Sequence, residues 1–367
     1  HFYVIGSVVR DGSWRELYDA NAQWTRASAI APTSTETFFV PVESPQLALL
    51  FAPFTRTEYT TALAIWLVVV VILYAGSYTL LWPDAQALRA YTGTALVTSV
   101  AFPGLFNLVL HGQTSAISLI ALATAAFALR RGRLFAAGIA VGMLVFKPHW
   151  MLAAVGVFLI AGEWRLVAGA MLGAGSQLAL TWLYVGSSVM RTYWRALQLL
   201  SSIADLLEPK PSDSLEGLFR VLVSDARIAV ALYLIAGVAI AITAARIWRS
   251  RAAFDVRFSA VVLAIVLTSP HTGTYDLIML GPVFLLLANW LVQCEQRRWV
   301  SRLVPLLAAA FVAPLLTGTP ALVRLQMSVS ATIAVLMVLR WICDSEHSRA
   351  GSPGFAEGSL GGVQPMA

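Results

Sequence analysis

Charged residues are scarce in this sequence. They make up 12% of its 367 residues, while 58% are hydrophobic, and the mean hydropathy is +0.75. A soluble domain is about a quarter charged, so this composition excludes an ordinary soluble protein. Many apolar runs reach roughly twenty residues, which is the length of a membrane-spanning helix rather than a strand. The sequence therefore predicts an all-α integral membrane protein.

Cysteine and paired carboxylates are also scarce. Cys294 and Cys343 are the only cysteines, and they form neither a disulfide framework nor a metal motif. No DxD-type carboxylate cluster is present, so we predict no metal ion and no cofactor. The net charge of +6 could indicate nucleic-acid binding. In a membrane protein, however, an arginine excess normally marks the cytoplasmic loops, and we predict no nucleic-acid partner.

The apolar runs predict a polytopic bundle of about eleven membrane segments. They cover residues 59–82, 93–110, 114–130, 134–146, 149–162, 166–188, 227–247, 256–269, 275–293, 303–317 and 322–342. If the loop 130–133 is cytoplasmic, most arginines of the short loops share its side, whereas Lys147 and Arg324 alone lie in short segments opposite. This bias predicts a multi-pass plasma-membrane protein whose chemically varied loops face outward.

Three parts of the chain are expected. Residues 1–58 form the first outer loop with interfacial helices, among them the short apolar piece 45–54 along the surface. Residues 59–347 form the membrane domain, whose outer loop 187–226 holds an interfacial helix over 191–207, a break at 208–211 and a helix that Ser212–Ser214 begins. Residues 348–367, rich in Gly, Ser and Pro, form a disordered cytoplasmic tail.

The stretch VFKPHW, residues 145–150, places one of only two lysines inside an apolar run from Leu134 to Gly162. A single span through it would place Lys147 at the membrane centre, at a cost of about 2.5–3.5 kcal/mol, and Pro148 inside a helix. We therefore predict two short segments, or a re-entrant hairpin, that break at Lys147. An ammonium group there can bind a phosphate; the alternative is a lysine that snorkels to the interface.

Other polar residues fall on the same outer face. The run SPHTGTYD, residues 269–276, opens a span with His271, Tyr275 and Asp276. His271 suits proton handling or phosphate contact, and Asp276 is either a ligand or a helix cap. His149 follows the Lys-Pro step, and Gln113 opens another span as a cap, an interhelical hydrogen bonder or a ligand. Histidines in loops, without matching depth in facing spans, argue against haem.

An ordered set of these stretches resembles glycosyltransferase family 87, the polyprenyl-phosphate-mannose-dependent mannosyltransferase-like proteins of the GT-C superfamily. The stretches are DGSWRELYD (Asp11–Asp19), PVESPQLALLFAPF (Pro41–Phe54), NLVLHGQTS (Asn107–Ser115), the Lys147-Pro148 step, SDSLEGLFRVL (Ser212–Leu222) and SPHTGTYD (Ser269–Asp276). The resemblance implies a GT-C-type helical bundle that moves a hexose, expected to be mannose, from a polyprenyl-phosphate sugar to a glycan or glycolipid hydroxyl, with inversion, at the outer membrane face.

The resemblance, combined with the chemistry of these side chains, gives each candidate a role. Lys147, His149 and His271 bind the donor phosphate, with His271 also catalytic, and Gln113, Tyr275 and Asp276 contact substrate. The family's catalytic aspartate would fall just before His1, so we expect the base upstream of His1 and consider Asp11 and Asp19 as substitutes for it. A lipid or solute transporter also uses broken helices, but it would show midplane charges and internal repeats, and no repeat is visible.

Overall fold

The computed structural model consists of helices, and it describes residues 1–32, 41–203, 213–316 and 326–350. Within these ranges there is no strand. Seven described helical stretches are long and apolar enough to cross a membrane, namely Tyr59–Asp84, Gln86–Leu110, Trp164–Leu199, Ala226–Trp248, Thr274–Val292, Arg297–Leu316 and Met327–Ser345. The predicted all-α polytopic membrane architecture is confirmed.

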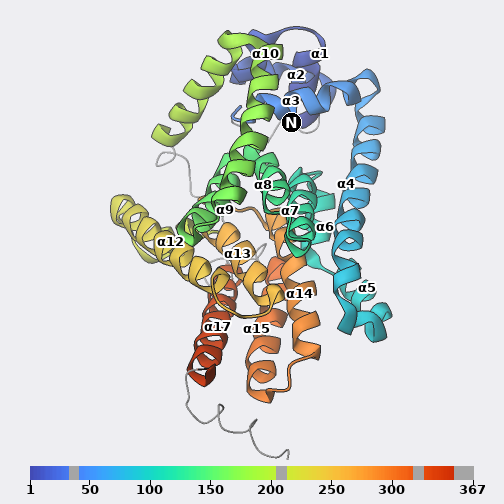
Figure 1. Cartoon of the computed structure of the whole chain (residues 1–367). Coiled ribbons are helices and arrows are strands. Elements are labelled where there is room, and N and C mark those ends of the chain that lie inside the picture. The colour runs from blue at the N-terminus through green and yellow to red at the C-terminus, as the bar shows by residue number, and fades with distance from the viewer. Residues whose placement is uncertain (33–40, 204–212, 317–325, 351–367) are drawn as a thin grey trace, which may run out of the picture.

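The remaining predicted segments are helices too short to span alone. They are α7 (Ser115–Arg130), α8 (Leu134–Gly142) with the 3-10 helix η6 (Met143–Phe146), α9 (Pro148–Ala161) and α13 (Phe254–Thr268). A span needs about 20 residues, so the described chain has seven full-length candidates in place of eleven segments. The short helices lie in the middle of the bundle, where neighbouring helices cover them (Figure 1).

The other helical elements of the bundle lie around this centre. In chain order they are α4 (Tyr59–Leu81) with η4 (Trp82–Asp84), η5 (Gln86–Tyr91), α5 (Thr92–Val100), α6 (Pro103–Leu110), α10 (Trp164–Ile203), α11 (Leu215–Leu222), α12 (Ala226–Trp248), η7 (Thr274–Leu280), α14 (Gly281–Val292), α15 (Arg297–Leu316) and α17 (Met327–Ala350). Large apolar side chains on their outer faces are exposed, including Ile72, Leu183 and Ile235. Exposed apolar faces of this kind suit contact with lipid.

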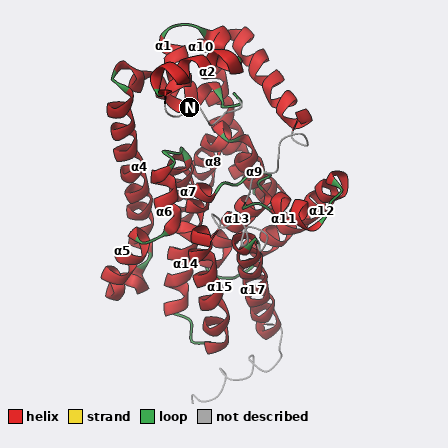
Figure 2. Cartoon of the chain, turned by 180° about the vertical axis from the view of Figure 1, so that it is seen from behind, coloured by secondary structure: helices red, strands yellow, loops and turns green. Residues whose placement is uncertain are grey.

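A group of short N-terminal helices, here called the cap, lies at one end of the bundle (Figures 1 and 2). It comprises α1 (Phe2–Arg10), η1 (Trp14–Tyr18), α2 (Ala20–Ile30), α3 (Pro45–Phe51) and η3 (Ala52–Arg56). At Gly6 a Cβ atom would lie 2.7 Å from the backbone carbon of Phe51, so α1 and α3 touch through their backbones. The piece 45–54 is too short to span, as predicted. Its apolar residues Leu47 and Phe51 are buried within the cap. The position of this piece along the membrane surface stays a prediction.

One long helix, α10, joins the bundle to the cap. It bends at Gly186, whose φ of 80° and ψ of 166° are accessible to glycine but strained for other residues. This kink separates the predicted span 166–188 from the predicted interfacial helix. Beyond it, Tyr193 packs against Tyr18 of the cap with ring centroids 5.8 Å apart. The predicted break at 208–211 and its neighbour Ser212 lie outside the described residues.

Glycines bring α8 and α10 into close contact. A Cβ on Gly138 would lie 2.0 Å from the carbonyl oxygen of Leu166, and one on Gly169 would lie 2.1 Å from that of Phe135. Small residues spaced four apart are the usual means of close helix packing in membranes, because they let backbones approach. This contact fixes the position of α8, and therefore the start of the break at Lys147.

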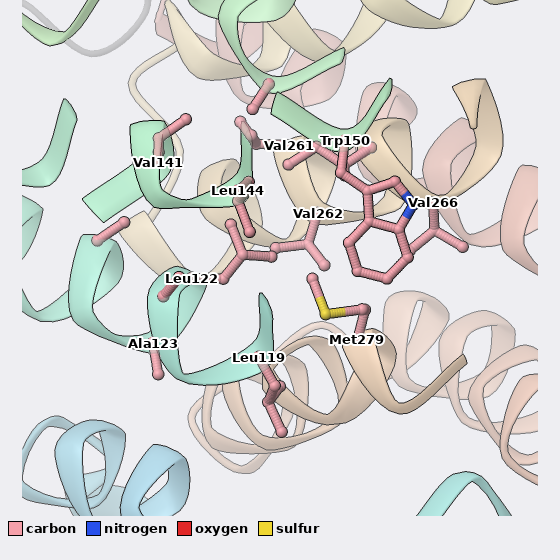
Figure 3. Packing of buried hydrophobic residues seen from close by; sticks show 14 of the residues in the cluster. Leu119, Leu122, Ala123, Val141, Leu144, Trp150, Val261, Val262, Val266 and Met279 are labelled. Carbon is pink, nitrogen blue, oxygen red and sulfur yellow. The ribbon is translucent and has the colours of Figure 1, made fainter. Parts of the chain in front are cut away.

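The apolar core lies between α7, η6, α9, α13 and η7 (Figure 3). Leu122, Leu144, Trp150, Val262 and Met279 come from these five elements, and each is at most 2% exposed. Segments that are far apart in the sequence thus converge at one place. The polar residues at the ends of α7, η6 and η7 are brought together by this packing.

A second polar network closes the bundle at the end of α7 away from Ser115. Arg130 bonds Asp255 at the start of α13 and lies 3.7 Å from Asp84 after α4. Asn289 of α14 donates from Nδ2 to Asp255 Oδ2 over 2.7 Å and accepts from the Ala87 amide over 3.1 Å. The loops that the arginine bias placed on one side therefore meet at one end. At the C-terminus α17 continues to Ala350, so residues 348–350 are helical, contrary to the predicted tail; residues 351–367 lie outside the described chain.

Candidate functional site

The predicted break at Lys147 is confirmed. Lys147 has φ −118° and ψ 79°, which are not helical, and α9 begins at Pro148. Proline lacks an N–H group and disfavours a helical residue before it, so the chain leaves η6, passes Lys147 and restarts as a new helix. The lysine side chain therefore leaves the bundle backbone at a non-helical position rather than from the middle of one span.

Lys147 forms a buried ion pair with Asp276. Its Nζ lies 2.7 Å from Asp276 Oδ1 and donates to Ser115 Oγ over 3.0 Å. The two side chains are 14% and 5% exposed. The sequence analysis treated Lys147 and Asp276 as separate candidates. The fold brings these two residues together although they are 129 positions apart. Snorkelling to open interface is excluded, because the charge has a partner inside the protein.

Asp276 is both a helix cap and the ion-pair partner of Lys147. Its Oδ2 accepts from the backbone N–H of Gly273 over 3.0 Å, as a capping side chain does at the start of η7. Its Oδ1 accepts from Lys147 and from Ser115 Oγ, the latter over 2.5 Å. Three donors already surround this carboxylate. The arrangement makes Asp276 a residue that positions Lys147, and a direct contact between Asp276 and substrate stays a prediction.

One donor of Lys147 remains. A lysine ammonium has three N–H groups, and Asp276 and Ser115 use two of them. The third has no hydrogen-bond acceptor among the described residues. Two aromatic rings flank the ammonium, with Nζ 5.0 Å from the Trp150 centroid and 5.8 Å from that of Tyr275. The geometry leaves Lys147 able to donate one hydrogen bond to an anion while its position stays fixed.

The predicted histidines lie around this pair at different depths. His149 is half-buried and interacts electrostatically with Lys147, Asp276 and His271. His271 is exposed, in the loop before η7. His111, which the sequence gave no role of its own, packs on Tyr275 with ring centroids 5.6 Å apart. Lys147, His149, His271 and Tyr275 are thus brought together, as the hypothesis of one shared site required.

Gln113 lies two residues before Ser115 at the start of α7. Its backbone N–H bonds the Leu108 carbonyl over 3.2 Å, which closes the turn between α6 and α7. Its side chain is half-buried and forms no hydrogen bond within the described residues. The residue that contacts Lys147 is instead Ser115, which the sequence analysis did not single out. A serine in the first turn of an apolar helix is too common a pattern to have indicated it.

The outer loop contributes a carboxylate that the sequence analysis also missed. Asp213 is 6% exposed, and it accepts from Thr274 Oγ1 over 3.2 Å and from Ser328 Oγ. Its neighbour Ser214 caps α11, as predicted, by accepting from the Gly217 amide over 3.0 Å. Burial raises the pKa of Asp213; the two hydroxyl donors lower it and Asp276 raises it, each to a smaller extent. These bonds fasten Asp213 to the start of η7 and to α17.

Neither acidic residue considered as a substitute base faces this site. Asp11 pairs with Arg26 over 2.6 Å and with Arg10 over 2.9 Å, and hydrogen bonds from these two arginines lower its pKa. Asp19 caps α2 by accepting from the amides of Asn21 and Ala22. Both carboxylates are therefore occupied within the cap. The carboxylate of the cap that does interact with Lys147 is Glu43, which the sequence analysis quoted only as part of a family-like stretch.

A pocket elsewhere in the bundle does not belong to the site. It has a volume of about 230 Å³ and lies between α4, α5, α14 and α15. Tyr78, Phe102, Phe284 and Phe311 are among its lining residues, and none of the candidate site residues is. The candidate site residues lie around Lys147 and do not line this apolar pocket.

These features define a class: a polytopic helical membrane protein with a buried, cation-containing polar site at the junction of broken helices. A comparison with protein-family models then gives the family. The model for glycosyltransferase family 87 matches residues 43–270, more than half of the chain, and the chain belongs to this family. It is therefore a membrane glycosyltransferase. No curated protein and no solved structure gave a match.

Proposed function

We propose that this glycosyltransferase moves a hexose, in our proposal mannose, from a polyprenyl-phosphate sugar to a hydroxyl of a glycan or glycolipid acceptor. The reaction takes place at the outer face of the plasma membrane and inverts the anomeric carbon. The observation that supports it is the remaining N–H donor of Lys147 within a broken membrane helix. A lipid-linked donor lies in the bilayer. A cation at a break in a membrane helix is therefore well placed to bind its phosphate.

The leaving phosphate needs stabilisation of its negative charge more than it needs protonation by an acid. In the reaction the bond between the sugar C1 and the phosphate oxygen breaks, and a bond from C1 to the acceptor oxygen forms. The acceptor proton passes to a base, for which His271 is our candidate, and polyprenyl phosphate departs with an added negative charge. Cationic donors that face this charge stabilise the transition state. Lys147 supplies the charge in our proposal, with His149 and His271 beside it, so that no metal ion is required.

The other candidates take supporting roles. Ser115 and Asp276 hold the Lys147 ammonium through the hydrogen bonds described above. Tyr275 and Gln113, both half-buried and close to this pair in the fold, are proposed to contact the sugar. His271 is exposed in the loop before η7, and we retain it as a catalytic candidate.

Substitution of Lys147 tests the phosphate role. A charge-assisted hydrogen bond is worth about 1.5–3 kcal/mol, so Lys147→Met should lower turnover of polyprenyl-phosphate mannose by roughly 10- to 150-fold. Lys147→Met also leaves Asp276 buried without its cationic partner, and the loss of one partner of a buried ion pair destabilises a protein by about 3–5 kcal/mol. The double variant Lys147→Met/Asp276→Asn removes both charges and is the matched control for this effect.

The double variant decides between the two roles of the lysine. If Lys147 binds phosphate, Lys147→Met/Asp276→Asn should fold like the wild type and stay as inactive as the single variant. Lys147→Arg should keep intermediate turnover, because a planar guanidinium replaces a compact ammonium. Recovery of wild-type turnover in the double variant, at equal amounts of folded protein, would show that the pair is structural and would overturn the proposal.

A further inference from the structure

Glu43 lies where the cap meets the Lys147 site. The residue comes just before α3, and its backbone carbonyl accepts a hydrogen bond from Tyr18 Oη over 3.2 Å. Pro45 starts α3 directly afterwards, and α3 is buried against α1. The backbone of Glu43 is therefore held from both sides. Its carboxylate lies within electrostatic range of Lys147 and of Asp276.

Three tyrosines lie within electrostatic range of this carboxylate. They are Tyr18 of η1, Tyr193 of α10 and Tyr275 of η7. Tyr18 and Tyr193 form a ring pair with centroids 5.8 Å apart and an interplanar angle of 33°. Three elements from distant parts of the chain thus bring tyrosine side chains near one acid. An acid among aromatic rings can bind the hydroxyl groups and the apolar C–H face of a sugar at the same time.

Hydrogen-bonding capacity in this region is unused. The carboxylate of Glu43 is half-buried and forms no hydrogen bond within the described chain. Burial raises the pKa of Glu43, Lys147 lowers it less, and Asp276 raises it. The adjacent Ser44, 2% exposed, has a buried hydroxyl without a partner, and both amide atoms of Gln46 also lack one. Buried polar groups are nearly always hydrogen-bonded, so this group of acceptors and donors indicates a polar ligand or water.

We propose that Glu43, with Tyr18, Tyr193 and Tyr275, forms the subsite that binds the sugar carried by the donor, while Lys147 binds the phosphate to which that sugar is attached. The inference rests on the proposed function and adds the ligand of the sugar ring to it. The Glu43 carboxylate accepts hydrogen bonds from two sugar hydroxyls, and the tyrosine rings contact the ring face. A sugar phosphate then spans from the cap to the broken helix at Lys147.

The charges give this subsite a distinctive signature. Glu43 is an anion close to Lys147, so it weakens the binding of a bare phosphate by Coulomb repulsion. A sugar on the phosphate reverses this effect, because its hydroxyls donate to the carboxylate. Removal of the Glu43 charge should therefore act in opposite directions on the two kinds of ligand. A residue that only supports the fold would change both in the same direction.

Equilibrium binding of two soluble probes tests the subsite in the detergent-solubilised full chain. Farnesyl phosphate carries the phosphate alone, and farnesyl phosphate mannose carries the sugar as well. Glu43→Gln should bind farnesyl phosphate mannose about 10-fold or more weakly, the size expected for hydrogen bonds to a charged group. The same variant should bind farnesyl phosphate as tightly as the wild type or more tightly. Glu16→Gln, a carboxylate of the cap paired with Arg26, is the matched control and should bind both probes normally.

The outcomes separate this inference from the proposed function. Equal binding of both probes by Glu43→Gln and wild type, or an equal loss of both, would overturn the sugar subsite. Lys147→Met/Asp276→Asn should weaken both probes, because it removes the phosphate donor. If that double variant binds farnesyl phosphate normally while Glu43→Gln still discriminates between the probes, the phosphate role of Lys147 is wrong and the sugar subsite stands.

Discussion

At the scale of single residues, the site is a set of buried charges that hold one another. Lys147 is fixed by Asp276 and Ser115, and Asp276 by Gly273. Asp213 is buried among hydroxyl groups, without a cation bonded to it in the described chain, and it interacts with Asp276 at a distance. Buried groups of this kind cost stability unless they are paired, so residues of this type are retained where they position other groups.

Asp213 gives a prediction for pH. Its pKa is raised above its ordinary value of 3.8, mainly by burial, so the folded state binds its proton more tightly than the unfolded state does. Stability from this residue is complete below that ordinary value and is lost as the pH rises through the higher folded-state pKa. Asp213→Asn mimics the protonated acid. The melting temperature of this variant in detergent should equal that of the wild type at about pH 4 and exceed it at about pH 8.

The comparison is made with one instrument and one detergent at both pH values. A variant with a lower melting temperature than the wild type near about pH 8 would contradict the prediction, because the charge itself would then be stabilising. The exposed Asp225, which caps α12 by accepting from Arg227 and Ile228, serves as the control position. Asp225→Asn should show no such gain at the higher pH.

At the scale of elements, the close contact of α8 and α10 sets where Lys147 emerges. Gly138 and Gly142 on α8 face Gly169 and Gly173 on α10, and a Cβ on any of them would lie 2.6 Å or less from a backbone oxygen. No side-chain rotation relieves a contact with backbone, so one helix would have to move. Because η6 and Lys147 follow α8 directly, a shift of α8 carries the lysine away from Asp276.

Two glycines of α10 make a matched pair for this idea. Gly169→Ala should destabilise the protein by roughly 1–3 kcal/mol, the usual cost of overpacking, and should also reduce turnover. Gly175 has no neighbour within 4 Å of its Cβ position, and Gly175→Ala should be neutral or stabilise by about 0.5–1 kcal/mol. Melting temperature and donor turnover are measured together. Equal behaviour of the two variants would show that the helix contact is looser than described.

At the scale of the whole molecule, the two polar regions lie at opposite ends of the central helices. Ser115 begins α7 at the Lys147 site, and Arg130 ends α7 in the network with Asp255 and Asp84. The cap lies at one end of the bundle and the loop between α14 and α15 at the other (Figure 1). The arginine-rich loops belong to the end without the cap, and from the positive-inside rule we predict that this end faces the cytoplasm.

Cysteine labelling tests this orientation. In a background with Cys294→Ser and Cys343→Ser, an introduced Ala29→Cys on the exposed face of α2 should react with a membrane-impermeant maleimide in intact cells. Glu295→Cys, exposed in the loop before α15, should react only after permeabilisation. Both positions are accessible in the folded chain, so they differ only in their side of the membrane. The reverse labelling pattern would place the Lys147 site on the cytoplasmic face.

The sequence by itself determined the class of fold and most of the residues around the site. Apolar runs and scarce charge required membrane helices, because a backbone in lipid must satisfy its own hydrogen bonds. The Lys147-Pro148 step required a break, because proline cannot continue the preceding helix. His149, His271, Tyr275 and Asp276 were gathered with Lys147 on one face by loop parity alone. The local sequence also predicted that Ser214 begins α11.

Only the tertiary structure decided how these residues are paired. The Lys147–Asp276 bond joins residues that are 129 positions apart, and neither sequence neighbourhood carries a sign of the other. Ser115, Asp213 and Glu43 were missed for the same reason: each is an ordinary polar residue in its own segment and gains its role from a partner in a distant one. Burial of α3 in the cap also depends on what packs around it. Local chemistry fixed which groups are present, and long-range packing fixed which of them meet.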